Sequence, residues 1–143
     1  MHAAIGMVDY ALPGFDDVRI LTGLTDPQAM LDFYLRLGPR IVVLKMGEAG
    51  AWVATPDRRT MIPAFPVHAV DATGAGDTFC GSFLARILAG DEAEDAARYA
   101  SVAAALKCTG YGAVGPIPMA QAVRAAMGRL APVLPLWHAM RTV

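Results

Sequence analysis

Apolar and polar positions along the chain group into short blocks that predict alternating strands and helices. An apolar run over residues 5–12 predicts a strand that ends at a Pro-Gly turn. Residues 15–21 predict a short helix with two acidic residues in its first turn, and Gly23 ends it. Apolar residues then recur at helical spacing from the Asp26-Pro27 cap to Leu37.

The middle of the chain predicts sheet. Residues 41–44 form a continuous, mostly β-branched apolar run, which is typical of a strand buried on both faces. A strand that directly follows a helix indicates a parallel sheet built from strand–helix–strand units. A second strand over 51–55 turns back into a third over 60–62, and the prolines that follow confine the next segment to an extended edge.

Helical periodicity dominates the C-terminal half, over residues 77–88, 91–107 and 119–128. Gly81 and Ser82 lie inside the first of these helices and predict a face that another backbone approaches closely. The fold class is therefore α/β. We expect one domain over residues 1–130 and a tail over 131–143 that has no clear period.

Composition narrows the class of protein. The chain has 143 residues, of which 55% are hydrophobic and 17% charged, and this excludes an intrinsically disordered protein. A net charge of −1 argues against a nucleic-acid partner or an acidic membrane surface. The longest uncharged stretch, 108–123, contains glycines and prolines that disfavour a membrane-spanning helix. The N-terminus lacks a signal peptide pattern and the two cysteines fit reduced thiols, so we expect a cytoplasmic protein.

The segment Val70-Asp-Ala-Thr-Gly-Ala-Gly-Asp-Thr-Phe79 carries the candidate chemistry. An extended segment leads through a glycine-rich turn into a helix, so that backbone N–H groups and the helix terminus favour a bound phosphate. A carboxylate repels phosphate, but Asp77 fits a general base that takes the proton of an attacking hydroxyl. In the alternative reading, Asp77 only caps the helix and the glycines only turn the chain.

The stretch from Asp71 to Phe79 closely resembles the C-terminal signature of the ribokinase-like (PfkB) family of ATP-dependent sugar kinases. Residues 42–51 resemble that family's strand and turn ahead of the nucleotide site, and residues 108–113 resemble the loop that closes over the nucleotide. Residues 12–17 with 21–23 are similar to the 2-keto-3-deoxygluconate kinase branch. The resemblance implies the C-terminal part of a three-layer αβα fold, with a partial parallel sheet flanked by helices.

The resemblance also implies roles for individual residues. Asp77 would be the catalytic base, and the backbone of Gly74, Ala75 and Gly76 would form the anion hole for the transferred phosphoryl group. The nucleotide-binding residues would be Lys45, Gly47, Gly50, Gly110 and Gly112. ATP, Mg²⁺ and a monovalent cation such as K⁺ are the implied cofactors.

The resemblance also implies binding positions for two cations. Asp71 and Thr73 would bind the monovalent cation, with carbonyls near Lys107, Gly110 and Gly112 as further ligands. Asp17 would hold Mg²⁺ through water, although Gly14 stands where the family has an asparagine. An ordinary carboxylate at a helix start is the alternative for Asp17, and a solvated charge at a strand end is the alternative for Lys45.

Other motifs carry less weight. Gly110-Tyr-Gly-Ala-Val-Gly115 spells a dinucleotide fingerprint, but a helix precedes it and prolines follow, so an oxidoreductase is disfavoured. No glycine is followed by the Lys-Ser or Lys-Thr of a P-loop, and the three histidines lack metal-ligand spacing. For Cys80 we expect packing rather than reactivity.

The resemblance reaches only the C-terminal half of such a kinase. The half that supplies most sugar contacts and the lid has no counterpart here, so we expect weak transfer to a sugar or sugar acid, or ATP hydrolysis. A non-catalytic nucleotide-binding remnant is the alternative function. A buried strand over 8–12 without its neighbours would expose an edge, which predicts a homo-oligomer.

Overall fold

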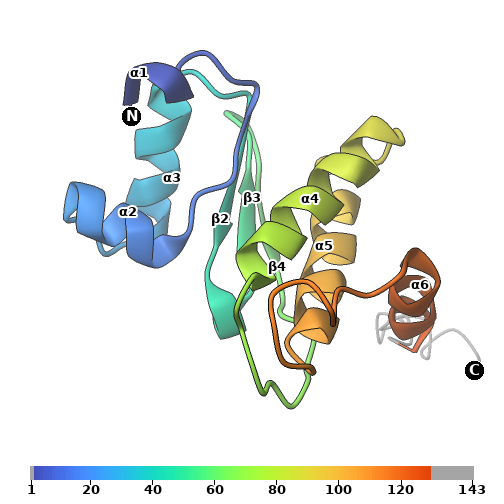
Figure 1. The fold of residues 1–143 in the computed structure, drawn as a ribbon. Helices are drawn as coiled ribbons and strands as arrows, with labels where there is room; N and C mark the ends of the chain where they lie inside the picture. Colours follow the sequence, from blue (N-terminus) through green and yellow to red (C-terminus); the bar gives the residue numbers. More distant parts are fainter. Residues whose placement is uncertain (1, 130–143) are drawn as a thin grey trace, which may run out of the picture.

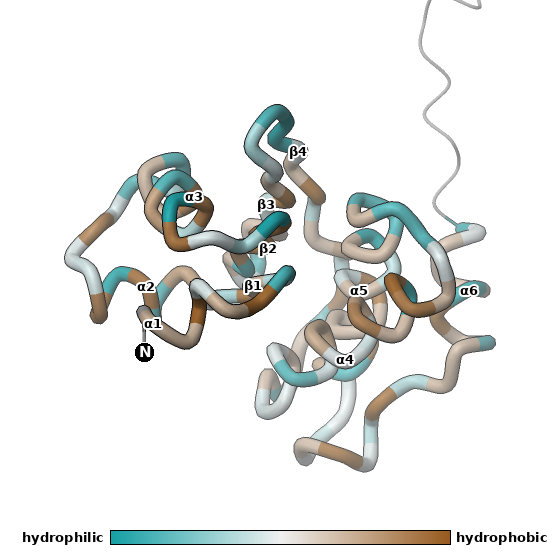
Figure 2. Tube along the Cα trace, turned by 90° about the horizontal axis from the view of Figure 1, so that it is seen from above, coloured by the Kyte–Doolittle hydropathy of each residue, from teal (hydrophilic) through white to brown (hydrophobic). Residues whose placement is uncertain are grey.

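The computed structural model describes residues 2–129, which form three layers, with one mixed sheet between two layers of helices (Figure 1). The elements in chain order are α1 (His2–Ile5), β1 (Tyr10–Ala11), α2 (Phe15–Thr22), α3 (Pro27–Arg36), β2 (Ile41–Lys45), the 3₁₀ turn η1 (Gly47–Ala49), β3 (Ala51–Ala54), β4 (Arg59–Ile62), α4 (Ala75–Leu88), α5 (Ala93–Lys107) and α6 (Ala120–Gly128). Seen from above, α2 and α3 lie on one side of the sheet, and α4 and α5 lie on the other with α6 outside them (Figure 2).

The sheet has the order β1-β2-β3-β4, and only β1 and β2 are parallel. The strands β2, β3 and β4 form an antiparallel meander. The expected parallel sheet is therefore limited to its first pair. The reason is connection length, because a parallel crossover needs a dozen or more residues and only the short η1 turn joins β2 to β3.

The strand predicted over residues 5–12 is wrong in its extent. Ile5 ends the helix α1, and the strand is reduced to Tyr10–Ala11, which pairs only with β2. The backbone is crowded at Gly6, where an added Cβ would lie 2.9 Å from the Leu37 carbonyl oxygen. The segment turns at this contact and becomes extended only beyond it, so β1 remains a short edge strand.

The core occupies both faces of the sheet. On one face, Val43 and Val53 pack with Phe79 and Phe83 of α4 and with the alanines of α5. On the other face, Val42 and Leu44 pack with residues of α2 and α3. The three β2 residues are almost inaccessible to solvent, as the prediction of a strand buried on both faces requires. A smaller cluster joins α5 to α6.

The helix ends follow the sequence signals closely. The Asp26 side chain accepts hydrogen bonds from the N–H groups of Gln28 and Ala29, and Gly23 ends α2 in the left-handed conformation with φ 74°. The expectation for Gly81 is wrong: a Cβ added there would meet nothing within 4 Å, so the small residues of α4 border open space rather than another backbone.

The tail expected over residues 131–143 lies outside the described residues. Among the helices that the structure describes, none is long and apolar enough to cross a membrane.

Candidate active site

The glycine turn leads directly into α4 and leaves backbone donors at its first turn. Gly74 adopts φ 78°, and a Cβ there would lie 3.0 Å from the Ala113 carbonyl oxygen. The N–H groups of Ala75 and Thr78 donate to carbonyls of the turn itself. Within the described residues, the N–H groups of Gly76 and Asp77 have no backbone acceptor, and the helix terminus gives them a partial positive charge. The turn can therefore receive an anion.

Lys45 brings a full positive charge to this turn from the end of β2. A Cβ added at Gly76 would lie 3.6 Å from the Lys45 Nζ, so the ammonium stands beside the first turn of α4. The same Nζ donates a hydrogen bond to the Cys80 Sγ at 3.2 Å. Lys45 is half-buried rather than fully solvated, and Cys80 is a half-buried free thiol whose sulfur accepts this hydrogen bond.

Asp77 lies in the same first turn with its side chain exposed. Across residues 2–129, its carboxylate makes no hydrogen bond or ion pair with another side chain. It borders a hollow of about 550 Å³, a volume within the range of ligand sites. An exposed carboxylate without a partner can accept a proton from a hydroxyl that binds beside it.

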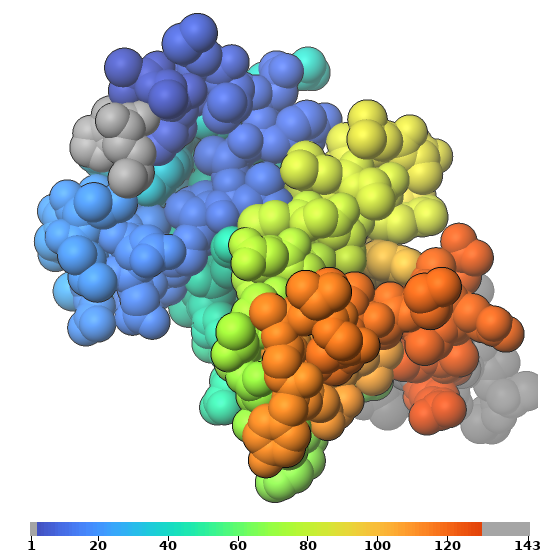
Figure 3. Space-filling view, in the orientation of Figure 1, coloured from blue at the N-terminus to red at the C-terminus, as the bar shows by residue number. Residues whose placement is uncertain are grey.

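The hollow beside Asp77 lies between α4, the loop after α5 and the start of α6. In Figure 3, the loop after α5 lies against the first turns of α4, in agreement with the contact between Gly74 and Ala113. The hollow beside Asp77 is lined by small residues of α4, by apolar residues of the loop and by three larger polar side chains. They are Gly74, Thr78, Gly81, Ser82, Ala85, Ala113, Val114, Ile117 and Ala120, together with Arg86, Tyr99 and Arg124. Such a surface suits a flat, partly apolar group next to a phosphate.

The two arginines of this hollow differ in their availability. Arg86 donates two hydrogen bonds to the Asp91 carboxylate and stacks 5.4 Å from the centre of the Tyr99 ring. These hydrogen bonds raise the pKa of Arg86 and lower that of Asp91. Arg124, in contrast, has no hydrogen-bonding or ionic partner in the described part of the chain. Arg124 is therefore the arginine of this hollow that is free to meet an anion.

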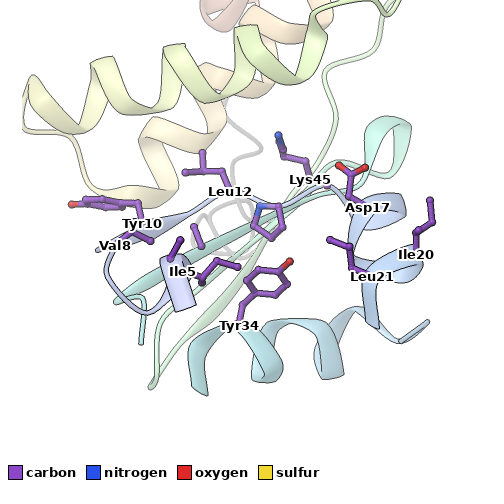
Figure 4. A pocket seen from close by; sticks show the side chains of 13 residues that line it. Ile5, Val8, Tyr10, Leu12, Asp17, Ile20, Leu21, Tyr34 and Lys45 are labelled. Carbon is purple, nitrogen blue, oxygen red and sulfur yellow. The ribbon is translucent and has the colours of Figure 1, made fainter. Parts of the chain in front are cut away.

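A second hollow, of about 660 Å³, opens beside β1 and is mostly apolar. Figure 4 shows Asp17 and Lys45 at one end of it, with Ile5, Val8 and Tyr10 toward the other end. The backbone brings the two charged residues together, because the Lys45 N–H donates to the Pro13 carbonyl at 2.9 Å and Asp17 follows in the first turn of α2. Burial raises the pKa of the nearby Tyr34 hydroxyl, and the charge of Asp17 raises it further.

The structure offers Mg²⁺ only a partial set of ligands. Among the described residues, no group of three or more His, Cys, Asp or Glu side chains could hold a metal ion. Mg²⁺ usually combines one or two carboxylates with waters and substrate phosphates, and the exposed Asp17 fits that arrangement. Asp17 would therefore supply one of the ligands that Mg²⁺ needs.

Asp71 ties the glycine turn to the end of α5. Its carboxylate accepts hydrogen bonds from the N–H groups of Thr73 at 2.9 Å and Gly112 at 2.7 Å. Its backbone carbonyl accepts a hydrogen bond of 2.8 Å from the Lys107 Nζ. We call these four residues the Asp71 clasp. Hydrogen bonds from Thr73, then the one from Gly112, lower the pKa of Asp71 from 3.8 to about 2.

The predicted nucleotide-binding glycines belong to two segments, the turn after β2 and the loop after α5. Gly112 belongs to the clasp, and Gly110 packs where a Cβ would lie 2.7 Å from the Pro116 Cβ. Gly50 has φ 91° and a Cβ there would lie 2.2 Å from the Ile62 carbonyl oxygen, so the sheet alone accounts for this glycine. Gly47 has φ 56° and borders neither hollow. The roles of these glycines in nucleotide binding stay predictions.

Comparison with known protein families identifies the family of this chain. The model of the pfkB family of carbohydrate kinases matches residues 1–120. The chain belongs to the pfkB family of carbohydrate kinases. The ribokinase-like resemblance of residues 42–51, 71–79 and 108–113 is thereby confirmed at the level of the family.

Individual relatives in this family are sugar kinases of more than one kind. The chain is 31% identical over 125 residues to a ribokinase of Staphylococcus aureus strain COL, covering 83% of this chain and 41% of the relative. It is also 31% identical over 114 residues to a 2-dehydro-3-deoxygluconokinase of Bacillus subtilis strain 168, covering 79% of this chain and 35% of that enzyme.

Solved structures of the family have the same fold. A ribokinase of Thermotoga maritima superposes with a TM-score of 0.85 at 28% identity, over 90% of this chain and 45% of that one. A double mutant of fructokinase from Vibrio cholerae O395, with fructose, ADP and potassium bound, superposes with a TM-score of 0.79 at 30% identity, over 85% of this chain and 41% of that one. The chain spans less than half the length of these relatives.

Sequence reasoning missed the lining of the hollow beside Asp77. Tyr99, Arg86 and Arg124 come from three different helices and share no motif, so only the tertiary structure brings them together. One signal was available: Tyr111, Val114, Ile117 and Met119 place bulky apolar residues in a glycine-rich loop, and all four are exposed. The side chain of Lys107 was also missed, because the resemblance implies a role only for carbonyls near it.

Proposed function

We propose that the chain is the nucleotide-binding and phosphoryl-transfer portion of an ATP-dependent sugar kinase. The observation that carries this proposal is the first turn of α4, where free N–H groups, the Lys45 ammonium and the exposed Asp77 carboxylate lie together. Membership of the pfkB family supports the same reaction class. The reaction would move the γ-phosphoryl group of ATP to a hydroxyl of a sugar or sugar acid.

The residues of the site would have different roles in that transfer. Asp77 would take the proton of the acceptor hydroxyl as its oxygen attacks the γ-phosphorus and ADP leaves. The backbone of Gly74, Ala75 and Gly76 would stabilise the charge on the transferred group, with the Lys45 ammonium beside it. Bound Mg²⁺ would neutralise phosphate charge, and Asp17 would hold it through water.

The adenine end of ATP would lie in the hollow beside Asp77. The exposed side chains of Val114 and Ile117 border that hollow, and Arg124 offers an unpaired positive charge there. Gly110 and Gly112 shape the loop that carries the apolar residues, and Gly47 and Gly50 shape the turn that follows Lys45.

We propose 2-keto-3-deoxygluconate as the acceptor. The resemblance of residues 12–17 and 21–23 to that branch supports it, as does the identity to the Bacillus subtilis 2-dehydro-3-deoxygluconokinase. The same level of identity to a ribokinase gives ribose equal support from the comparisons. A cytoplasmic location and a homo-oligomeric state stay predictions from the sequence.

A titration of the chain with ATP in the presence of Mg²⁺, followed by calorimetry, tests the nucleotide half of the proposal. We expect saturable binding near one site per chain, because the anion-binding turn is already formed. Release of ADP with 2-keto-3-deoxygluconate, ribose or fructose then identifies the acceptor. Absence of ATP binding at millimolar concentration would contradict the proposal.

A non-catalytic nucleotide-binding remnant is the second candidate function. The first turn of α4 and Arg124 would hold a nucleotide whether or not an acceptor binds. If ATP raises the melting temperature but no sugar is phosphorylated, the chain binds nucleotide without catalysing transfer.

A further inference from the structure

Lys107 holds a positive charge inside the protein, directly beneath the candidate active site. It is the last residue of α5, and its relative exposure is 0%. Lysines are almost never fully buried without a partner, because an unpaired buried charge is costly. The partner here is a backbone carbonyl, that of Asp71, at 2.8 Å from the Lys107 Nζ.

The surroundings of this ammonium connect three parts of the site. The Cys108 carbonyl accepts hydrogen bonds from the N–H groups of Val70 and Asp71, which fastens the glycine turn to the end of α5. The Asp71 carboxylate reaches across to Gly112 in the loop after α5. The charge of Lys107 therefore lies where the turn, the helix end and the loop meet.

The family resemblance implies a monovalent cation at Asp71 and Thr73, with carbonyls near Lys107, Gly110 and Gly112 as further ligands. The structure shows that the Asp71 carbonyl already accepts a hydrogen bond from an ammonium group. A lysine ammonium is a compact point charge that donates hydrogen bonds, so at this oxygen it can supply the positive charge that K⁺ would bring. A second cation beside it would be repelled.

We propose that the Lys107 ammonium takes the place of the monovalent cation in this chain, so that the Asp71 clasp and the anion site form without K⁺. This inference rests on the proposed function, which supplies the reason for a positive charge beneath the phosphate site. Lys107 acts through Asp71 and the glycine turn, and is a positioning residue rather than a catalytic one.

The wild-type chain provides the first test. Its melting temperature and its affinity for ATP with Mg²⁺ are measured at one ionic strength in potassium, sodium or tetramethylammonium chloride. We expect the same melting temperature in all three salts and ATP affinities that agree to within about twofold, because no binding of K⁺ is linked to folding or to ATP. A saturable increase of either quantity in K⁺, absent in tetramethylammonium, would overturn the proposal.

The variant Lys107→Met provides the second test. Removing the ammonium leaves the Asp71 carbonyl without its donor, so the variant should melt at a lower temperature in tetramethylammonium chloride and recover stability saturably as K⁺ is added. Arg98→Met is the matched control, because it removes one positive charge from an exposed position of the same helix. We expect no dependence on K⁺ in that control.

The outcomes separate the two proposals. A Lys107→Met variant that folds but gains no dependence on K⁺ would overturn the replacement of a cation by Lys107. If this variant does not fold, the salt series on the wild-type chain decides alone. If ATP binds in no salt, the proposed function fails, while the melting temperatures still decide the role of Lys107.

Discussion

Asp77 is a carboxylate without a partner at the start of a helix, among the residues that the structure describes. Replacing it with asparagine keeps its size and removes its ability to accept a proton. We expect Asp77→Asn to lower kcat for sugar phosphorylation by about 10²–10⁴-fold, the usual contribution of a general base. ATP affinity measured by calorimetry should be retained, because a negative charge does not assist phosphate binding.

The reading of Asp77 as a simple cap predicts a different result. A cap contributes to the stability of α4, and its loss costs about 1 kcal/mol. The structure shows no side-chain capping hydrogen bond at the start of α4. If Asp77→Asn lowered the melting temperature but left turnover unchanged, the capping role would be the correct one.

The pKa of Asp71 predicts how stability responds to acid. Because hydrogen bonds from Thr73 and Gly112 lower this pKa from 3.8 to about 2, the native state favours the ionised carboxylate. That contribution to the free energy of unfolding is fully present above the unfolded pKa of about 4 and is lost as the pH falls toward about 2. Urea unfolding across this range, followed by circular dichroism, measures the loss.

The matched variants for this prediction are Asp71→Asn and Asp57→Asn, which remove one negative charge each. Asp57 is exposed in the turn between β3 and β4. We expect Asp71→Asn to flatten the dependence of unfolding free energy on pH, and Asp57→Asn to keep the wild-type slope. An unchanged slope in Asp71→Asn would show that the clasp does not depend on the ionised carboxylate.

At the scale of elements, the turn between β2 and β3 depends on one glycine more than on the other. Gly50 has φ 91°, and a Cβ there would overlap the Ile62 carbonyl at 2.2 Å. Gly47 has φ 56°, but a Cβ there would meet nothing within 4 Å. Both substitutions place a side chain in an unfavourable backbone conformation, and only the first adds a clash with β4.

We therefore expect Gly50→Ala to lower the free energy of unfolding by about 2–4 kcal/mol, because backbone strain and a steric clash combine. Gly47→Ala should cost about 1 kcal/mol, the usual penalty of a left-handed residue. Chemical denaturation of the two variants measures the difference. Equal effects would indicate that the turn adjusts, and that the packing of β4 on Gly50 is not the constraint.

At the scale of the whole molecule, the two edges of the sheet differ. Around β4, Arg59 is paired with Asp32 and donates a hydrogen bond to Gln28. Around β1, the neighbouring surface is apolar, with Val8 and Ile20 exposed at the rim of the hollow. Charged side chains at a sheet edge oppose pairing with another chain, and an apolar surface there favours it. The homo-oligomer predicted from the sequence would therefore form through β1, with a second copy of the chain as the occupant.

Ile20→Lys tests this location. Ile20 is 77% exposed, so a lysine is tolerated in the monomer but opposes burial of the apolar surface at a contact. We expect light scattering to give a mass above 15.1 kDa for the wild-type chain and a shift toward the monomer for the variant. Leu88→Lys, at an 89% exposed position at the end of α4, should leave the mass unchanged. A wild-type monomer would contradict the prediction.

The sequence by itself determined the local elements and the family. Some features depend only on neighbours in the chain, so their patterns can be recognised without tertiary contacts. They are the helix ends at Asp26 and Gly23, the buried run at 41–44 and the signature from Asp71 to Phe79. The same signature identified the pfkB family, and the family model confirms it.

Only the tertiary structure decided the features that depend on distant segments. The pairing of β1 with β2, the short length of β1 and the open face at Gly81 follow from how distant segments pack, which no local pattern encodes. The burial of Lys107 against Asp71 joins residues 36 positions apart. The Lys107 side chain is fully buried because the tertiary structure brings the Asp71 carbonyl against its ammonium group.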